Sequence, residues 1–265
     1  MSKSVITALL IGAAVMCACF AGCTGTETPG ASSETGADNV PTYIVGIDAP
    51  YPPFSLVDKE GKPTGFDTES MEWIAKEQGF KVEFRQIAFD SLVTSLEHGN
   101  IDIIYSGMTI TPDRAEKINF THPYWQVNQT VITKADSALT MDNVMAGKAT
   151  VGTQRGTTAG IWMDEHLVAN GTMPKENVKH YDTISLAVTD LENGNIDAVM
   201  FDSTVINDVM AGKNLKKIGS IDTQEYFGIG VRKSDTALLN SLNEGLDTLM
   251  NDPYWQELIT KYNME

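Results

Sequence analysis

The chain has 265 residues and a formal net charge of −16 at pH 7, and 42% of its residues are hydrophobic. This composition is typical of a globular protein, and the length suffices for one large domain or two modest ones. Because a strongly acidic surface repels phosphate groups, we expect no nucleic-acid partner.

Residues 1–23 are predicted to be a secretion signal. Lys3 supplies a short positive region, and Val5 to Phe20 form an uncharged apolar run that is short for a membrane span. The run ends in Phe20-Ala21-Gly22-Cys23, which resembles a bacterial lipobox, although leucine is usual where Phe20 stands. Cys23 would then be lipidated and become the mature N-terminus. An uncleaved anchor helix is the alternative, and either one places the body of the protein outside the cytoplasm.

The segment after Cys23 differs in composition from the rest of the chain. Residues 24–42 are rich in Thr, Gly, Ser, Pro and Glu and contain no aromatic residue before Tyr43. Such a segment cannot bury a core and is predicted to be a flexible tether. The three cysteines all precede it, so a chain cleaved before Cys23 has no cysteine pair for a disulfide within its body.

From Tyr43 onward, apolar runs alternate with stretches of helical periodicity, which predicts an α/β fold with parallel strands. The predicted elements are a strand over Tyr43–Ile47, a helix over Phe66–Gln78, a strand over Lys81–Phe84, a helix over Phe89–Glu97 and a strand over Ile101–Tyr105.

An internal repeat indicates two lobes of similar plan. Leu96-Glu97-His98-Gly99-Asn100-Ile101-Asp102 returns as Leu191-Glu192-Asn193-Gly194-Asn195-Ile196-Asp197, each time between a predicted helix and a predicted strand. The upstream pair Val45-Gly46 likewise returns as Val151-Gly152. Coincidental recurrence of a common helix-Gly-strand turn is the alternative.

Ligands of open α/β sheets bind outside the carboxyl ends of the strands. In the first half these ends deliver Asp48 and the segment Ser106-Gly107-Met108-Thr109. In the second half they deliver Thr153 to Thr158 and Asp202. We therefore expect two lobes to present polar groups to one shared cleft.

Arg114 is a candidate anion-binding residue. Thr111 is a suitable N-cap and Pro112 a suitable first helical residue, which places Arg114 in the first turn of a helix. A guanidinium, a hydroxyl and helix amides there can bind a carboxylate. The alternative is a solvated surface arginine.

Asp202 is the complementary candidate. It ends an apolar run, Ile196 to Met200 followed by Phe201, so its carboxylate needs a polar partner. It can cap a helix that begins at Ser203, or it can bind the ammonium group of a ligand. An Arg on one lobe and an Asp on the other match the two charges of an α-amino acid.

The proline-rich loop Asp48 to Phe54 presents two aromatic residues on a stiff backbone. We expect Phe54 to lie in the core and Tyr51 to stack on a ligand side chain. Phe89 can form a second wall of the pocket or belong to the core.

Other chemistries lack support in the sequence. The four histidines, His98, His122, His166 and His180, have no metal-ligand spacing, and no nucleophile motif is present. We expect no metal and no cofactor.

Taken together, these residues resemble the extracellular solute-binding proteins of family 3, the amino-acid-binding proteins of ABC importers. The resemblance spans Tyr43 to Tyr262 and is strongest over Phe89 to Trp125. The residues that carry it there are Leu92, Leu96, Gly99, Ile101-Asp102, Ser106 to Thr109, Thr111 to Arg114, Phe120 and Pro123-Tyr124. Gly65-Phe66-Asp67, Gly156-Thr157-Thr158 and Tyr254-Trp255 also fit.

The resemblance implies a two-lobed periplasmic-binding-protein-like fold of type II. Lobe 1 would comprise residues 43–127 and 226–265, and lobe 2 residues 128–225, with hinges near 125–130 and 223–228. The family also implies hinge closure, a monomer, and permease subunits of an ABC transporter as partners.

The resemblance also implies roles for individual residues. Arg114, Thr109 and Thr158 would hold the α-carboxylate of a free amino acid, and Asp202 with Ser106-Gly107 its ammonium. Tyr51 and Phe89 would enclose the side chain, and Asp48, Gln154 and Thr157 would lie near its far end. Asp48 favours a polar or basic ligand, whereas Arg155 could favour an acidic one.

Two other classes of function stay open at this point. An enzyme on the same fold, similar to cyclohexadienyl dehydratase, would need a general acid in the cleft, where Asp48 and Asp202 are the candidates. A sensory input module would need a signalling segment after Glu265, and the given sequence shows none.

Overall fold

A computed structural model describes residues 40–264. The predicted signal, Cys23 and residues 24–39 of the predicted tether lie outside the described residues. Thr42, expected as the last tether residue, instead begins the first strand. Over the described range no helix is long and apolar enough to cross a bilayer.

The first sheet has five strands and mixed directions. In spatial order they are β4 (Lys81–Gln86), β1 (Thr42–Ile47), β5 (Ile103–Ile104), β12 (Gly230–Arg232) and β6 (Ile118–Phe120). Strands β4, β1 and β5 run parallel, whereas β12 pairs antiparallel with both β5 and β6. A separate short antiparallel hairpin, formed by β2 (Leu56–Val57) and β3 (Pro63–Thr64), follows β1 in the chain.

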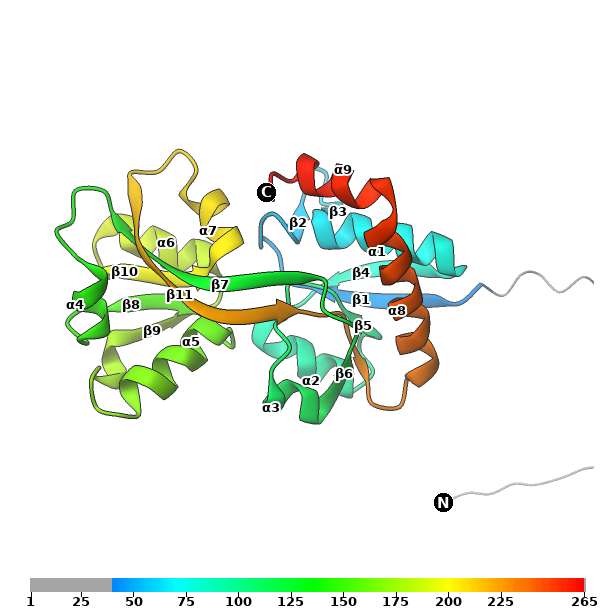
Figure 1. Ribbon diagram of the computed structural model, residues 1–265, viewed down its shortest axis with the longest axis horizontal. Coiled ribbons are helices and arrows are strands. Elements are labelled where there is room, and N and C mark those ends of the chain that lie inside the picture. Colours follow the sequence, from blue (N-terminus) through cyan, green and yellow to red (C-terminus); the bar gives the residue numbers. More distant parts are fainter. Residues whose placement is uncertain (1–39, 265) are drawn as a thin grey trace, which may run out of the picture. The chain divides into compact units, whose positions relative to one another are not determined.

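The second sheet also has five strands, and two of them run between the sheets. In spatial order they are β11 (Leu215–Phe227), β7 (Trp125–Lys134), β10 (Ala198–Asp202), β8 (Val151–Gln154) and β9 (Val178–Tyr181). Strands β10, β8 and β9 are parallel, and β7 is antiparallel to both β10 and β11. Figure 1 shows β7 and β11 side by side as a ribbon that reaches toward the first sheet. We call the part built on each sheet lobe 1 and lobe 2.

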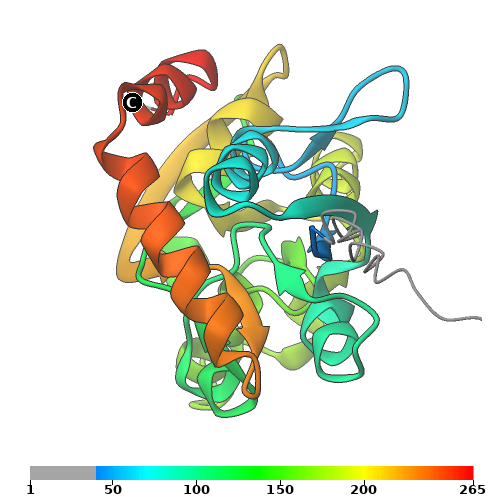
Figure 2. The ribbon, with the colours of Figure 1, turned by 90° about the vertical axis from the view of Figure 1, so that its right-hand side faces the viewer.

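Helices cover the faces of both sheets. In lobe 1 they are α1 (Phe66–Gln78), α2 (Leu92–Glu97) with the preceding 3₁₀ turn Phe89–Ser91, α3 (Pro112–Lys117), α8 (Thr236–Asn251) and α9 (Pro253–Lys261). In lobe 2 they are α4 (Met141–Met145), α5 (Thr158–Met163) with the π-helical turn Asp164–Val168, the 3₁₀ turn Lys175–Asn177, α6 (Ile184–Asn193) and α7 (Ser203–Met210). Figure 2 shows α8 and α9 in succession on one side of lobe 1, where both pack against α1.

The internal repeat corresponds to a repeated structure at the helix–strand junction. Asp102 and Asp197 occupy the same position of the motif, and each carboxylate accepts a hydrogen bond from a backbone N–H of the neighbouring strand. The donors are Ile44, at 2.9 Å from Asp102, and Thr150, at 2.8 Å from Asp197. The repeated aspartate therefore fastens the chain after the helix to the start of the adjacent strand.

In each lobe the repeated isoleucine packs against the repeated glycine, which must lack a side chain to make room for it. Ile101 packs over Gly46, and a Cβ on that glycine would lie 2.4 Å from the Ile101 Cδ1 atom. Ile196 packs over Gly152 in the same way, at 2.5 Å. Since the two lobes share this contact as well as the aspartate, the sequence repeat reflects a common βα unit.

Several predicted elements are confirmed and others are corrected. The helix over Phe66–Gln78 is confirmed, and it ends at Gly79, which adopts a left-handed conformation. The predicted helix over Phe89–Glu97 begins instead with a 3₁₀ turn, and the predicted strand over Ile101–Tyr105 has only two paired residues. The prediction of parallel strands is confirmed for β1, β4 and β5. Strand β12, which the sequence did not predict, comes from chain beyond lobe 2 and pairs antiparallel with β5 and β6.

Candidate ligand-binding cleft

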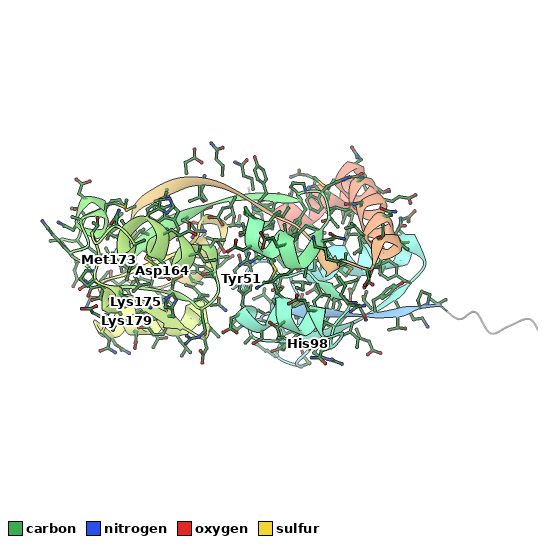
Figure 3. All side chains as sticks on the ribbon, turned by 90° about the horizontal axis from the view of Figure 1, so that it is seen from below. Tyr51, His98, Asp164, Met173, Lys175 and Lys179 are labelled. Atoms are coloured by element: carbon green, nitrogen blue, oxygen red, sulfur yellow. The ribbon has the colours of Figure 1, made fainter. Side chains whose placement is uncertain are left out.

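The carboxyl ends of strands from both sheets meet in one region. Asp48 follows β1, Gln154 ends β8 and Asp202 ends β10. Figure 3 shows Tyr51, from the loop after β1, where the two lobes approach each other. Hydrogen bonds join these residues across the lobes, so the structure brings together side chains that the sequence places far apart.

Tyr51 and Asp202 form one of these contacts. The Tyr51 hydroxyl donates to Asp202 Oδ2 at 2.6 Å. The Tyr51 ring packs against Phe54 and Phe201, with ring centroids 5.5 and 5.8 Å away, and only 2% of the residue is exposed. The expectation that Tyr51 stays outside the core is therefore wrong, because its ring belongs to the core, and both the ring and the hydroxyl contact the opposite lobe through Phe201 and Asp202.

Gln154 and Asp48 form a second contact across the lobes. The Gln154 amide donates to Asp48 Oδ2 at 2.6 Å. Burial raises the pKa of Asp48 to about 6, and the nearby charge of Asp90 adds to the increase, although the bond from Gln154 opposes it. This carboxylate forms no ion pair within residues 40–264.

Asp202 is held by hydrogen bonds and forms no ion pair in the part of the chain that the structure describes. Its second oxygen accepts from the Gln129 amide at 2.8 Å. It stands at the N-cap position of α7, but its side chain makes no capping bond, so the alternative of a helix cap is not supported. Burial raises the pKa of Asp202 to about 6; the charge of Glu225 acts in the same direction, and the bond from Tyr51 opposes both.

Arg114 is a buried cation in the first turn of α3. Thr111 caps this helix by accepting from the Arg114 N–H, as predicted. The guanidinium donates to the carbonyl of Thr109 at 2.7 Å and, across the lobes, to that of Gly156 at 2.9 Å. It lies over the ring of Phe89, 5.4 Å from the centroid. Burial lowers the pKa of Arg114 to about 10, and among the described residues the guanidinium has no ion-pair partner.

Hydrogen bonds to other residues of lobe 1 hold the segment Ser106 to Thr109 in place. Ser106 accepts from the Asp48 N–H at 2.9 Å, and the Gly107 N–H donates to the buried carboxylate of Asp67 at 2.7 Å. Gly107 has a positive φ of 54°, and a Cβ there would lie 2.3 Å from the Tyr51 ring. Glycine at this position therefore lets Tyr51 pack against the backbone.

The threonines of the predicted site behave differently from one another. Thr109 and Thr158 both donate to Glu225 Oε2, the former at 3.1 Å. Thr157 turns inward instead, and its hydroxyl donates to the Gln154 carbonyl at 2.7 Å within its own loop. Phe89 is buried and belongs to a hydrophobic cluster with Leu92 and Ile104, so it is a core residue as well as a surface for Arg114.

Arg155, whose direction the sequence left open, lies on the rim. Half of its side chain is exposed, and it forms ion pairs with Asp90 at 3.7 Å and Asp182 at 3.5 Å. Its charge is therefore already matched by carboxylates, and it provides no argument for an acidic ligand.

Sequence reasoning missed three residues of this region. Glu225 and Gln129 lie on the ribbon strands β11 and β7, and they are joined by a hydrogen bond of 3.1 Å. Asp67 lies beneath Gly107, and burial raises its pKa to about 7. Glu225 and Gln129 could have been found because they place a carboxylate and an amide inside segments that were expected to act as hinges.

The arrangement suits a small zwitterion, which carries a positive and a negative charge on one molecule. Where the lobes meet, one buried guanidinium and two buried carboxylates form no ion pair with any residue of 40–264. The cost of burying such charges falls when an opposite charge binds beside them. Over residues 40–264 no group of histidine, cysteine and acidic side chains is arranged to hold a metal ion.

Comparison with known proteins agrees with this geometry. Residues 43–265 match the family model described as bacterial extracellular solute-binding proteins, family 3. A "Probable histidine-binding protein" of Neisseria gonorrhoeae is 30% identical over 99% of this chain and 96% of that protein. The "ABC transporter arginine-binding protein 1" of Escherichia coli K12 is 32% identical over 86% of this chain and 93% of that protein.

Solved structures show the same two-lobed α/β fold. An ancestral arginine-binding protein bound to arginine superposes with a TM-score of 0.76 and 32% identity, covering 83% of this chain and 97% of that one. An ancestral amino-acid-binding protein described as a precursor of cyclohexadienyl dehydratase has a TM-score of 0.73 and 33% identity, covering 83% and 94%. The chain belongs to the bacterial extracellular solute-binding proteins of family 3.

Proposed function

We propose that this protein is the amino-acid-binding component of an ABC importer and that it takes up a free polar or basic amino acid between its lobes. The observation that carries this proposal is the pair of oppositely charged, buried and ion-unpaired residues Arg114 and Asp202. An α-amino acid carries the two matching charges on one carbon. The relatives named above support the same class of ligand.

The proposed contacts follow the chemistry of each group. Arg114 with Thr109 and Thr158 holds the α-carboxylate, and Asp202 with the Ser106-Gly107 segment holds the ammonium. A charge-assisted hydrogen bond contributes on the order of 1.5–3 kcal/mol. Both sets form together only when the lobes close, so a zwitterion stabilises the closed form.

The ligand side chain would extend between Tyr51 and Phe89 toward Asp48, Gln154 and Thr157. Asp48 is the residue that favours a basic side chain, because its carboxylate is buried and its hydrogen-bond donor among the described side chains is the neutral amide of Gln154. A guanidinium, imidazolium or ammonium group at that position would supply the missing cation.

Closure by an amino acid would be an exchange of hydrogen bonds. In the described structure Tyr51 bonds Asp202, Gln154 bonds Asp48 and Arg114 bonds the Gly156 carbonyl. These direct contacts between lobes involve residues of the proposed site. We infer that a ligand replaces several of them while the ribbon strands β7 and β11 bend as hinges.

A screen of ligands tests the function. The purified body of the protein is heated with each of the twenty amino acids, and each shift in melting temperature is followed by calorimetry. We expect stabilisation by one or a few polar or basic amino acids, because a ligand that binds only the folded state raises its stability. Absence of stabilisation by every amino acid would contradict the proposal.

An enzymatic role is the second candidate, because one structural neighbour is a dehydratase precursor. Burial raises the pKa of Asp48 and Asp202 to about 6, which suits a general acid. We propose nevertheless that the protein is not an enzyme, since both carboxylates have roles in binding. Incubation with prephenate and with arogenate should show no turnover above the rate in buffer.

We further propose that the protein is attached to the membrane through a lipid on Cys23, after removal of residues 1–22. The family itself is extracytoplasmic. In this arrangement residues 24–41 tether a monomer whose lobes comprise residues 42–127 with 226–265, and residues 128–225. Incorporation of labelled palmitate in cells should disappear in Cys23→Ala and persist in Cys19→Ala.

A further inference from the structure

Glu225 contacts both hydroxyls that are assigned above to the carboxylate of the ligand. One of its oxygens, Oε2, accepts from Thr109 at 3.1 Å and also from Thr158. The other oxygen accepts from the Gln129 amide at 3.1 Å. Thr109 belongs to lobe 1 and Thr158 to lobe 2, so one carboxylate oxygen joins the two lobes.

Because each threonine hydroxyl has one proton, its bond to Glu225 excludes a bond donated to a ligand. A threonine hydroxyl has a single proton to donate. Thr109 and Thr158 each donate that proton to Glu225, and neither has a second one for a ligand. A ligand carboxylate can accept from both threonines only after Glu225 has moved away.

The charge of Glu225 acts on the same groups as the proposed ligand would. It favours the protonated form of Arg114, as an α-carboxylate beside that guanidinium would. It also raises the pKa of Asp202, the residue assigned to the ammonium group. Glu225 therefore resembles the carboxylate end of an amino acid in position and in electrostatic effect.

The surroundings of Glu225 provide space for it to leave. A cavity of about 550 Å³ is lined by Glu225 together with Thr109, Thr158 and the exposed side chains of Ile161 and Tyr226. The pairing of β11 with β7 shifts register between Ile221 and Glu225, so the intervening residues lie outside the regular ladder. A side chain beside such an irregular segment can turn into the cavity without breaking the sheet.

We propose that the Glu225 carboxylate occupies the position of the ligand's α-carboxylate in the ligand-free protein and that an amino acid must displace it in order to bind. This inference rests on the proposed function. An internal competitor lowers the apparent affinity in proportion to the fraction of molecules in which the site is free. Glu225 would thus set the affinity without contacting the bound amino acid.

Two variants of Glu225 test the inference. Glu225→Gln removes the charge while keeping the shape, and Glu225→Ala removes the side chain beyond Cβ. With the best amino acid from the ligand screen, calorimetry should show binding that is about five- to tenfold tighter than wild type in both variants. Thermal unfolding without ligand checks that each variant folds.

Glu165→Gln is the matched control. Glu165 lines the same cavity and is exposed, and no hydrogen bond to Thr109 or Thr158 is formed by it within the described chain. The substitution removes the same charge from the same neighbourhood. We expect its affinity to remain within about twofold of wild type, because solvent and salt screen an exposed charge and Glu165 bonds neither threonine.

The outcomes separate this inference from the proposed function. Tighter binding in both Glu225 variants, with Glu165→Gln unchanged, supports displacement. Equal or weaker binding in the Glu225 variants, while the wild type still binds an amino acid, overturns the inference and leaves the proposed function intact. Lack of binding by the wild type and all variants overturns both.

Discussion

The Tyr51 hydroxyl and the Asp202 carboxylate, 151 residues apart in the chain, lie 2.6 Å apart across the two lobes. The amide of Gln154 and the carboxylate of Asp48 repeat this relationship at 2.6 Å. Polar groups proposed to bind the ligand thus satisfy one another in the described structure. Each proposed ligand contact therefore has a competing protein contact, and substitutions must be judged on both.

Replacing Asp202 by Asn should weaken amino-acid binding by roughly 10- to 100-fold, because a charge-assisted bond to the ammonium group becomes a neutral one. The folded protein should lose little stability, because the amide oxygen can still accept from Tyr51 and the removal of a buried charge offsets the loss of the hydrogen bond from Gln129, which the amide NH2 cannot accept. Calorimetry and thermal unfolding of the same preparation measure the two effects.

Asp208→Asn is the control for this substitution. Asp208 lies on α7, the helix that follows Asp202, and its side chain is exposed. The substitution Asp208→Asn changes the net charge of the protein by the same amount as Asp202→Asn, but outside the cleft. Equal losses of affinity in both variants would show that net charge, and not the ammonium contact, is responsible.

Arg114→Ala should reduce affinity by more than about 100-fold, because two hydrogen bonds from a guanidinium to the ligand carboxylate are lost together. The fold should persist, since the cost of burying the cation disappears along with its bonds to the Thr109 and Gly156 carbonyls. Arg155→Ala removes an arginine from the exposed rim and should bind nearly as wild type. Retained affinity in Arg114→Ala would refute the carboxylate assignment.

Local sequence patterns predicted those parts of the fold that depend on local chemistry. The helix Phe66–Gln78 was predictable to the residue because Gly79 ends it in a left-handed conformation. The repeated Asp102 and Asp197 indicated two similar lobes because each bonds a nearby strand. The antiparallel pairing of β12 with β5 was not predictable, since it joins residues more than 120 positions apart through tertiary packing.

The candidate site was predictable to the extent that it follows strand ends. Arg114 was identified from its place in the first turn of a helix capped by Thr111, and Asp202 was identified because a carboxylate ends an apolar run. Glu225 was missed because its segment was expected to act only as a hinge, and the sequence does not show that Thr109 and Thr158 from the two lobes both donate to it. The burial of Tyr51 was also missed, because a proline-rich loop alone does not show what packs upon it.

Asp48→Asn should change the selectivity of the protein more than its overall ability to bind. A basic side chain loses its counter-ion, whereas a neutral polar side chain gains a hydrogen-bonding amide. We expect the ratio of affinities for arginine and glutamine to fall by about tenfold or more. Asp208→Asn, which removes an exposed carboxylate on α7, should leave this ratio unchanged.

Affinity for a basic amino acid should rise between pH 5 and pH 7. Burial holds the pKa of both Asp48 and Asp202 at about 6 in the ligand-free protein. A bound cation favours the ionised carboxylates and lowers both pKa values, so binding releases protons in this range. Each group contributes at most about a tenfold gain per pH unit.

Calorimetry in buffers of different ionisation enthalpy counts the released protons directly. The number should approach two near pH 5 and fall toward zero above pH 7. Asp48→Asn and Asp202→Asn should each remove about one of them. A pH-independent affinity with no proton release would contradict the assignment of these carboxylates to the cations of the ligand.

Gly107→Ala should impair both stability and binding. The added Cβ would lie 2.3 Å from the Tyr51 ring, and the residue has a φ of 54°, where alanine is strained. Gly99→Ala is the matched control, because Gly99 has a φ of 74° with no atom near the added Cβ. The control should lose about 1 kcal/mol of unfolding free energy from strain alone. Gly107→Ala should lose about 1–3 kcal/mol more, through overpacking against Tyr51.

Displacement of Tyr51 would also loosen its bond to Asp202, so affinity should fall only in Gly107→Ala. Denaturant unfolding and calorimetry of the two variants separate backbone strain from the steric contact that positions the cleft.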